Sequence, residues 1–320
     1  MKKIILFADP GIDDSIAIMY ALLNPDIQVL AIVSSYGNTS KEQATDNIAY
    51  LLKLAGREDI PIIGGTNSPS SGEIPTYYPE IHGQEGLGPI RPPESFSGEL
   101  TNFSELYKII KDQEDITIVD VGRNTSLASL HLLGENIVEE IKEFYIMGGA
   151  FMVPGNVTPS AEANFYGDPI ASQVVIRDLN NLYIVPLNVS NKAIITMDQI
   201  RYVQQMSDNP LIEIMDEVME YYIEAYKKLV PGINGAPLHD VVTLSLMVNP
   251  EMGQSIRREV NILTTGIGKG TSIADFRPSS KPAEKNINIF LDLDYSKFVE
   301  DFINVMGKAD GRPRKILTPD

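Results

Sequence analysis

The sequence of 320 residues contains no cysteine, no tryptophan and only three histidines. The absence of cysteine excludes disulfides, thiolate metal sites and a cysteine nucleophile, and it agrees with a reducing compartment, so we expect a cytoplasmic protein. No apolar run is long enough to cross a bilayer. The first apolar run, residues 4–8, ends at Asp9 and is too short for the core of a secretory signal peptide.

Basic residues are scarce: 26 Lys and Arg stand against 43 Asp and Glu, which gives a net charge of −17. A surface of this charge repels phosphate backbones and anionic lipid headgroups, so we expect neither nucleic acid nor membrane as a partner. The same charge favours cations. Hydrophobic residues make up 43% of the chain and charged residues 22%, as in ordinary globular proteins.

Short apolar runs alternate with longer segments of helical periodicity, which predicts an α/β fold with a mostly parallel central sheet and helices on both faces, as in a Rossmann-like core. We find no linker or repeat, and so expect a single domain over residues 1–320. The expected strands are residues 4–8, 29–34, 60–63, 116–121, 144–147, 182–186, 260–263 and 287–290. The clearest helices are expected at residues 13–23, 41–54 and 295–305.

Two long connections, residues 66–100 and 148–167, interrupt this alternation. Loops of this length inside a compact domain are usually lids or binding loops. Both follow predicted strands directly, so they lie at the carboxyl edge of the sheet, where open α/β folds bind ligands. The sequence therefore predicts a site at this edge.

An acidic cluster, Asp9, Asp13 and Asp14, occupies the turn after the first predicted strand. Three carboxylates this close repel one another unless a cation or a proton neutralises them, and oxygen ligands suit Ca²⁺ or Mg²⁺. The alternative is that Asp13 or Asp14 caps the following helix, which leaves the third aspartate unexplained. A phosphohydrolase is disfavoured because Gly11 occupies the position where such enzymes usually carry a second aspartate.

Five sequence blocks together resemble the nucleoside hydrolases of the inosine-uridine preferring type. The first block is similar to that family's signature D-x-D-P-G-x-D-D, and the others follow in family order up to about residue 250. The blocks are Asp9-Pro10-Gly11-Ile12-Asp13-Asp14, Tyr36-Gly37-Asn38-Thr39, His82-Gly83 to Gly86-Leu87-Gly88, Met147-Gly148-Gly149 with Gly155-Asn156 to Asn164, and Leu238-His239-Asp240.

The resemblance implies hydrolysis of the N-glycosidic bond of ribonucleosides to ribose and a free base, with bound Ca²⁺. Such a reaction passes through an oxocarbenium-like state, whose positive charge carboxylates stabilise. By resemblance, the metal ligands are Asp9, Asp14, Asp240 and the carbonyl of Val121. Asp9 also takes the proton of the attacking water. A homodimer or homotetramer is implied as well.

The residues implied to bind the substrate fall into three groups. Amides and carboxylates hold the ribose hydroxyls: Asp13, Asn38, Asn156, Glu162 and Asn164. Without the resemblance, Asn156 would be read as turn chemistry and Glu162 as a surface charge. Of the histidines, His239 is the better candidate to assist the leaving base and His82 lies in the substrate pocket, while His131 is read as an ordinary helix residue. Tyr222 and Tyr226 share one helix face, where they stack on the base or simply pack.

Three departures from the family pattern bear on activity. Phe7 stands where the signature usually has its first aspartate, and residues 123–125 and 188–191 differ from the family's usual turns. The loss of an acid beside the metal can weaken metal affinity or activity about 10–100-fold. The sequence therefore predicts a working hydrolase and leaves open a non-catalytic or weakened nucleoside-binding homologue.

Overall fold

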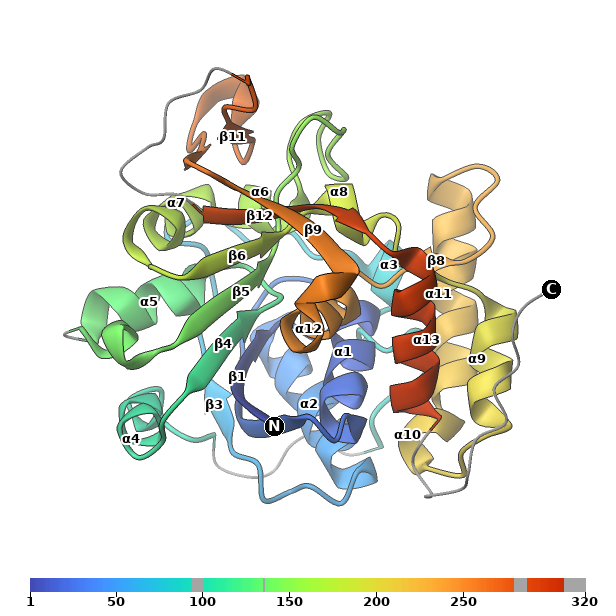
Figure 1. Cartoon of the computed structure of the whole chain (residues 1–320). Coiled ribbons are helices and arrows are strands. Elements are labelled where there is room, and N and C mark those ends of the chain that lie inside the picture. Colours follow the sequence, from blue (N-terminus) through green and yellow to red (C-terminus); the bar gives the residue numbers. More distant parts are fainter. Residues whose placement is uncertain (94–99, 135, 279–286, 308–320) are drawn as a thin grey trace.

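The computed structural model describes residues 1–93, 100–134, 136–278 and 287–307. Its centre is an eight-stranded sheet of order β3-β2-β1-β4-β5-β6-β12-β9 (Figure 1). All neighbouring strands are parallel except the last pair, β12 and β9. The strands are β1 (Lys2–Ala8), β2 (Ile27–Ser34), β3 (Ile62–Gly64), β4 (Ile116–Asp120), β5 (Glu143–Met147), β6 (Leu182–Val185), β9 (Gly253–Arg258) and β12 (Ile287–Leu293). The predicted mostly parallel α/β architecture is confirmed.

One predicted strand was assigned to the wrong sheet. Residues 260–262 form β10 (Val260–Ile262), which pairs with β11 (Ser272–Ala274) in a separate antiparallel hairpin. The strand that completes the main sheet is β9, which the sequence analysis did not predict. Its residues are mostly exposed or half-buried, as is typical of an edge strand, and so it has no apolar run to reveal it.

Helices cover both faces of the sheet, as predicted. The side chains of β1 alternate between two apolar clusters: Leu6 packs with α1 (Ile12–Leu23) on one face, and Phe7 packs with α5 (Thr125–Leu133) on the other. On the first face lie also α2 (Lys41–Leu54), α9 (Met197–Gln204), α10 (Pro210–Glu213), α11 (Met215–Leu229), α12 (His239–Val248) and α13 (Tyr295–Met306). On the second lie also α4 (Glu105–Lys111) and α7 (Pro169–Asp178).

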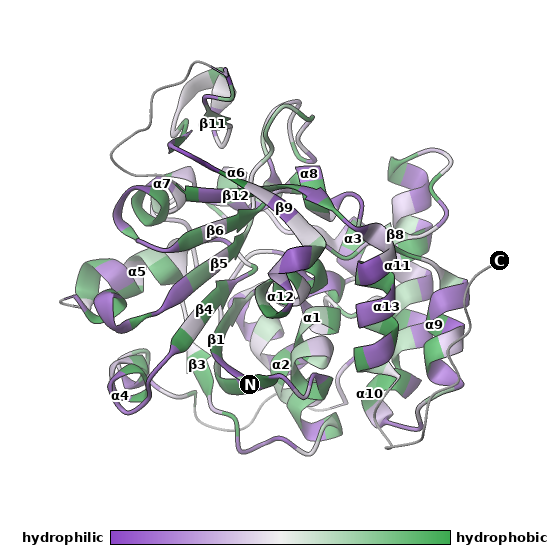
Figure 2. Ribbon diagram, in the orientation of Figure 1, coloured by the Kyte–Doolittle hydropathy of each residue, from purple (hydrophilic) through white to green (hydrophobic). Residues whose placement is uncertain are grey.

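Short elements fill the connections. They are α3 (Pro79–His82), α6 (Ala163–Gly167), α8 (Leu187–Ser190), the pair β7 (Ile194–Ile195) and β8 (Ala236–Pro237), and three 3₁₀ turns at Ile137–Glu140, Pro250–Met252 and Gly266–Gly268. Figure 2 shows apolar colouring along the inner strands, whereas the outer helices α11 and α13 are banded apolar and polar. Strands buried on both faces read as continuous apolar runs, which is why the sequence located them.

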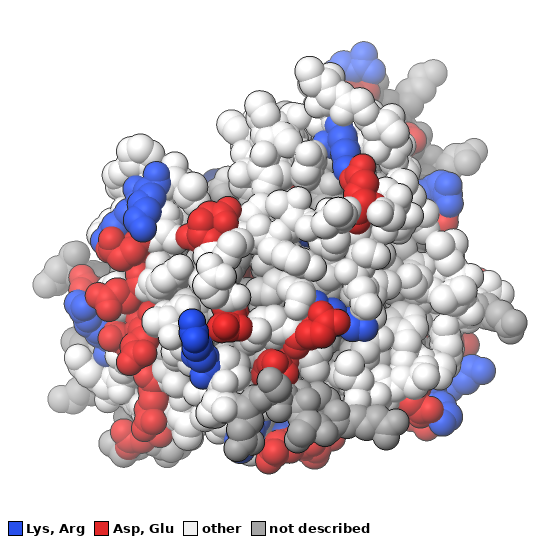
Figure 3. Space-filling model, turned by 180° about the vertical axis from the view of Figure 1, so that it is seen from behind, with Lys and Arg blue, Asp and Glu red and all other residues white. Residues whose placement is uncertain are grey.

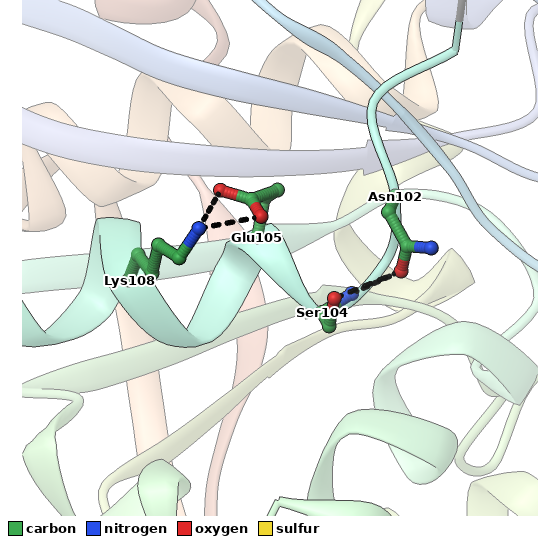
Figure 4. A network of polar contacts seen from close by, with 4 residues as sticks. All are labelled: Asn102, Ser104, Glu105 and Lys108. Atoms are coloured by element: carbon green, nitrogen blue, oxygen red, sulfur yellow. Dashed lines mark hydrogen bonds and ion pairs between the residues drawn. The ribbon is translucent and has the colours of Figure 1, made fainter.

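The start of α4 shows how surface turns are fixed locally (Figure 4). The side-chain oxygen of Asn102 accepts hydrogen bonds from the N–H and the hydroxyl of Ser104, each at 2.9 Å. One turn later, Lys108 pairs with Glu105 at 2.8 Å. Both interactions are exposed, so they contribute little to stability.

The strand order creates a crevice beside β1. From β1 the chain adds β2 and β3 on one side and then returns to add β4 on the other. Open α/β sheets bind ligands at this switch point, outside the carboxyl ends of the strands. Asp9 follows the end of β1 and Val121 follows the end of β4, so both lie at the predicted edge.

No helix in the described part of the chain is long and apolar enough to cross a bilayer. In Figure 3, the described Lys and Arg side chains stand among acidic ones and form no continuous basic patch on the face shown.

Candidate active site

The turn after β1 holds the carboxylate of Asp14 against the backbone. Asp14 Oδ1 accepts the N–H of Asp9 at 3.0 Å, and its Oδ2 accepts the N–H of Gly11 at 3.3 Å. The side-chain amide of Asn38 donates to the same Oδ2 at 2.8 Å. The capping role that the sequence left open is thus correct for Asp14, which satisfies N–H groups at the start of α1.

The carboxylate of Asp9 is buried between two glycines. A Cβ atom on Gly37 would lie 1.3 Å from Asp9 Oδ2, and one on Gly122 would lie 3.2 Å from Asp9 Cγ. Asn38 also approaches, with its amide nitrogen 3.4 Å from Asp9 Oδ1. A side chain at position 37 would therefore displace the Asp9 carboxylate from its place in this structure.

Asp13 joins the first turn to a helix near the other end of the chain. Its Oδ2 accepts the N–H of His239 at 2.8 Å across 226 residues, and the N–H of Asp240 at 3.4 Å. Its Oδ1 is buried and accepts no hydrogen bond from the described residues. The two segments expected to meet at the site do so, and one buried acceptor there is free for a hydroxyl or a cation.

Burial and neighbouring carboxylates raise the proton affinity of the aspartate cluster. Burial raises the pKa of Asp9, Asp13, Asp14 and Asp240, and nearby carboxylates raise three of these pKa values further: Asp14 acts on Asp9 and Asp13, and Asp13 acts on Asp240. The positive charge of Arg123 opposes this effect and lowers the pKa of Asp9. Carboxylates with raised pKa values bind a proton or a cation readily, since either relieves the repulsion.

The donor chemistry of this cluster fits a hard cation. Buried carboxylates with uncompensated charge and an unused oxygen on Asp13 are the ligands that Ca²⁺ prefers. Within the described ranges, however, no three Asp, Glu, His or Cys side chains are grouped so that they could hold a metal ion. The carbonyl of Val121 accepts a hydrogen bond from the Asn164 amide at 2.9 Å. The residues thus fit the cation in kind and in charge, and they are held here by hydrogen bonds to the protein.

A cavity of about 390 Å³ opens above this cluster. Its lining includes every residue predicted for the site except Asp9 and Asp14, namely Asp13, Asn38, His82, Val121, Asn156, Glu162, Asn164, Tyr222, Tyr226, His239 and Asp240. The amide of Asn38 contacts both Asp9 and Asp14. Its other lining residues include Tyr78, Ile81, Met147, Val157, Asn191, Leu229 and Val230. These residues were not predicted from the sequence. Tyr78, Val157, Asn191 and Val230 lie outside helices and strands, in segments that carry no periodicity.

Glu162 and its neighbours form the wall at the end of β5. The Glu162 carboxylate is buried at the start of α6, where it accepts the N–H groups of Gly149 at 3.0 Å, Asn164 at 2.7 Å and Phe165 at 3.1 Å. A solvated surface charge is therefore excluded at this position. Burial raises the pKa of Glu162, and the three N–H donors hold that increase back.

Asn156 lies at the exposed mouth of the cavity. Its side-chain oxygen accepts the N–H of Ala163 at 3.0 Å. The turn chemistry considered from the sequence is therefore present together with a position in the cavity lining.

Both candidate histidines are buried and neutral near pH 7. Burial and the charge of His239 lower the pKa of His82 to about 3, and burial lowers the pKa of His239 to about 4. His82 Nδ1 accepts the N–H of Ile12 at 3.0 Å, so its proton is on Nε2. His239 lies between two hydroxyls, with Nε2 at 3.0 Å from the Tyr226 oxygen and Nδ1 at 2.7 Å from Ser190 Oγ.

The tyrosines of α11 combine packing with a place in the cavity. Tyr222 stacks on His82 at 5.8 Å between ring centroids and meets Tyr226 edge-to-face at 4.9 Å. Both residues also line the cavity, so the packing interpretation is correct and substrate binding by these tyrosines stays a prediction. His131, in contrast, lies on α5 and pairs with Asp178 at 3.3 Å, away from the cavity, as its interpretation as an ordinary helix residue predicted.

Two charged residues near the end of β4, Asp120 and Arg123, were not predicted as site residues. Arg123 is buried, its Nη2 donates to the carbonyls of Gly37 at 3.0 Å and Thr76 at 2.5 Å, and it lies 5.1 Å above the Tyr36 ring. Asp120 is also buried, and burial raises its pKa to about 7. Neither side chain lines the cavity.

Comparison with known proteins identifies what this fold and site are similar to. The family model described as inosine-uridine preferring nucleoside hydrolase matches residues 4–300. The pyrimidine-specific ribonucleoside hydrolase RihA of Citrobacter koseri is 35% identical over 299 residues, which cover 91% of this chain and 94% of the relative. A solved plant nucleoside hydrolase superimposes with a TM-score of 0.90 at 28% identity and covers 96% of this chain and 99% of that chain. A purine-preferring ribonucleoside hydrolase from Gardnerella vaginalis gives a TM-score of 0.87 at 25% identity, with 96% and 98% covered.

Proposed function

The chain belongs to the nucleoside hydrolase family, enzymes that act on N-glycosyl compounds, and on this premise we propose that it cleaves ribonucleosides to ribose and base with Asp9 as the general base and Ca²⁺ as cofactor. The observation that carries the proposal is the junction of the first turn with α12. Hydrogen bonds from the backbone N–H groups of His239 and Asp240 to Asp13 bring Asp240 to the cluster at the end of β1.

Asp9, Asp14, Asp240 and the carbonyl of Val121 are the proposed ligands of Ca²⁺. When bound, the cation supplies positive charge that orients ribose hydroxyls and lowers the pKa of a coordinated water. Two features of the site support the assignment: the carboxylates are buried with raised pKa values, and Asp13 Oδ1 has no partner among the described residues. The alternative of Mg²⁺ is less suited, because a site of this many rigid carboxylates leaves little room for the waters that Mg²⁺ keeps.

The proposed reaction uses the carboxylates twice. Asp9 accepts the proton of the water that attacks the anomeric carbon, and the negative charge of the whole cluster stabilises the oxocarbenium-like sugar. Asp13 Oδ1 accepts a ribose hydroxyl, and the amides of Asn38, Asn156 and Asn164 both donate to and accept from the other hydroxyls. Glu162, held by three backbone N–H groups, offers its remaining lone pairs to the sugar.

The leaving base needs a proton or a hydrogen bond as the bond to the sugar breaks. Both ring nitrogens of neutral His239 contact hydroxyls, so we propose that His239 acts through Tyr226: Nε2–H donates to the Tyr226 oxygen, and the Tyr226 hydroxyl donates a hydrogen bond to the base. His82, whose Nδ1 is engaged by the backbone, presents Nε2–H as a second donor. Tyr222 and Tyr226 provide ring faces and edges for the base.

We propose pyrimidine ribonucleosides as the preferred substrates. The support is the name of the Citrobacter koseri relative, which is pyrimidine-specific and 35% identical. The purine-preferring structural relative is less similar, at 25% identity. Uridine and cytidine are therefore expected to react faster than inosine and adenosine.

The binding-only alternative, which Phe7 raised, is not favoured. The Phe7 ring is buried in the apolar cluster under the sheet and does not line the cavity, so its presence removes no residue that would touch a nucleoside. A protein that only binds nucleosides would give calcium-linked binding by calorimetry without release of ribose.

The test is release of reducing sugar from uridine, cytidine, inosine and adenosine, with Ca²⁺ and with a chelator, by the wild type and by Asp9→Ala. We expect turnover that the chelator removes and that Asp9→Ala reduces by at least about 100-fold. Phosphate release from nucleotides serves as the negative control for a phosphohydrolase. Folded, calcium-loaded protein that cleaves none of the four nucleosides would contradict the proposal.

We also propose that the active enzyme is a homodimer or homotetramer in the cytoplasm. The basis is the resemblance of the chain to the family, together with the absence of cysteine, which suits a reducing compartment. Light scattering of the eluted protein tests the assembly, and a mass equal to one 35.3 kDa chain at micromolar concentration would contradict it.

A further inference from the structure

The Asp9 carboxylate is held by two backbone segments that are themselves held by charged side chains. Gly37, in the turn after β2, and Gly122, after β4, approach Asp9 closely enough that added Cβ atoms would lie 1.3 and 3.2 Å from its carboxylate. Arg123 donates to the carbonyl of Gly37 at 3.0 Å. Asp120 accepts the N–H of Gly122 at 3.2 Å. Arg123 therefore holds the backbone of Gly37, and Asp120 holds the backbone of Gly122.

Arg123 is fixed on several sides. Besides Gly37 it bonds the carbonyl of Thr76 in the long loop after β3, at 2.5 Å, and it covers the ring of Tyr36. Gly167 packs directly on it, since a Cβ there would lie 2.4 Å from Arg123 Nε. A buried guanidinium with partners in three segments has little freedom to move. Arg123 therefore fixes the turn that carries Gly37 relative to the end of β4.

Asp120 is fixed by two hydrogen bonds and lies beside Phe7 in the sheet. Its second oxygen accepts the side-chain amide of Asn124 at 3.0 Å, so one carboxylate ties two residues of the turn. On the neighbouring strand its register partner is Phe7, the residue that replaces the first acid of the family signature. A buried carboxylate is thus present beside Asp9, one strand away from the position where the signature would place it.

We propose that Arg123 and Asp120 are positioning residues for Asp9, and that by fixing the backbone of Gly37 and Gly122 they set where the Asp9 carboxylate lies during proton transfer. The inference rests on the proposed function of Asp9. Since neither residue lines the cavity, their loss affects the chemical step and leaves nucleoside binding intact. A displacement of about 1 Å at a reacting group can cost about 100-fold in rate.

The experiment compares two truncations with their conservative counterparts. Arg123→Met removes the donors and the charge, and Arg123→Lys keeps one donor group. Asp120→Ala removes the acceptor, and Asp120→Asn keeps an oxygen for the Gly122 N–H. We expect kcat to fall about 10–100-fold in the two truncations, with KM within about two-fold of the wild type. In Arg123→Lys and Asp120→Asn we expect kcat to recover partly. If a truncation does not fold, the conservative variant of the same residue provides the test. A lower kcat with unchanged KM in that variant supports the inference, and an unchanged kcat contradicts it.

Asp301→Asn is the matched control. Asp301 accepts hydrogen bonds from Tyr20, Ser245 and Asn249 at 2.5, 2.6 and 3.0 Å, at the ends of α1 and α12 remote from the cavity. This variant loses a similar carboxylate network, and we expect it to lower the unfolding temperature and leave kcat and KM unchanged. Truncations that behave like this control, or that shift kcat and KM together, would overturn the inference.

Calcium affinity separates this inference from the proposed function. If Asp9 moves, the dissociation constant for Ca²⁺ measured by calorimetry rises about 10-fold in Arg123→Met and Asp120→Ala but not in the control. This readout needs no turnover. A wild type that binds Ca²⁺ yet cleaves no nucleoside defeats the proposed function, while unchanged calcium affinity in the truncations counts against the positioning role alone.

Discussion

Phe7 and Asp120 are register partners on β1 and β4, so a buried aromatic ring and a buried carboxylate lie side by side on one face of the sheet. Phe7 packs in the apolar cluster on that face. Because parallel neighbours share a face, any acid introduced at position 7 would face Asp120 in an environment that already raises the pKa of Asp120 to about 7. The proximity of Phe7 to Asp120 therefore determines how a substitution at position 7 changes stability.

Phe7→Asp is expected to destabilise the protein without raising its activity. The change removes a buried ring, which costs about 3–5 kcal/mol, and adds a second buried carboxylate next to Asp120. Phe7→Leu keeps an apolar side chain and is expected to cost about 1–2 kcal/mol. Denaturant unfolding of the three proteins measures both differences. An Asp variant as stable as the wild type and more active would show that the chain has lost an acid it needs.

Asp13→Ala is expected to lower both stability and substrate affinity. The substitution leaves the N–H groups of His239 and Asp240 without their acceptor, at a cost of about 2–4 kcal/mol in the free energy of unfolding. Asp13→Asn keeps an acceptor oxygen and removes one repelling charge, so its stability should stay close to that of the wild type while KM rises. Equal stability of the Ala and Asn variants would contradict this reading of the junction.

The stabilisation that Ca²⁺ provides is expected to grow with pH. Burial raises the pKa of Asp9, Asp13, Asp14 and Asp240 in the folded protein, so the folded state holds protons that the unfolded state has released. Without a cation, the stability from this proton uptake is present below the ordinary carboxylate pKa and is lost as pH rises through the raised values. Protons and Ca²⁺ compete for the same oxygens, so calcium binding strengthens as the protons leave.

Thermal unfolding between pH 5 and 8, with Ca²⁺ and with chelator, measures this linkage. His82 and His239 act in the opposite sense: burial lowers their pKa values to about 3 and 4, so their contribution is present above the ordinary histidine pKa and is lost as pH falls. The histidine contribution is the same with Ca²⁺ and with chelator, so it largely cancels when the two unfolding temperatures are subtracted. A calcium-induced shift in unfolding temperature that is constant with pH would show that the carboxylates are not the ligands.

Ser190→Ala is expected to slow reactions that need a proton on the leaving base. Ser190 Oγ lies 2.7 Å from His239 Nδ1 and fixes the orientation of the ring. General acid–base assistance by a positioned side chain contributes about 100-fold or more to the rate. Because loss of the Ser190 hydroxyl disturbs the orientation of His239 but keeps its ring, we expect kcat for uridine to fall by about 10-fold. A riboside with a phenolate leaving group, which departs without a proton, is the control and should react at the wild-type rate. Equal slowing of both substrates would argue against a role in leaving-group protonation.

The sheet could be predicted because its inner strands are apolar on both faces. Residues 4–8 and 116–121 were placed within a few residues of β1 and β4 for this reason. The polar edge strand β9 gave no such signal, and residues 260–263 have the same apolar pattern in a hairpin that they would have in the sheet. Periodicity shows that a segment is a strand but does not show which strand it pairs with, in the main sheet or in a hairpin.

The site was predicted from its sequence blocks, and its supports were not. Asp13, His239 and Asp240 were expected together and do meet. Arg123 and Asp120 were not identified as site residues, because the role that we propose for them depends on burial and on hydrogen bonds to the backbone of Gly37 and Gly122, which no motif marks as their partners. Whether Asp14 caps its helix was likewise undecidable from spacing alone.

The bond between Asp13 and α12 is made by peptide N–H groups, which every residue type except proline carries at positions 239 and 240. The side chain at position 239, which we propose assists the leaving base, can therefore be exchanged for another while the two distant segments of the chain stay joined. The proposed contact with the leaving base and the link to Asp13 thus depend on different atoms of residue 239, the first on its side chain and the second on its backbone N–H.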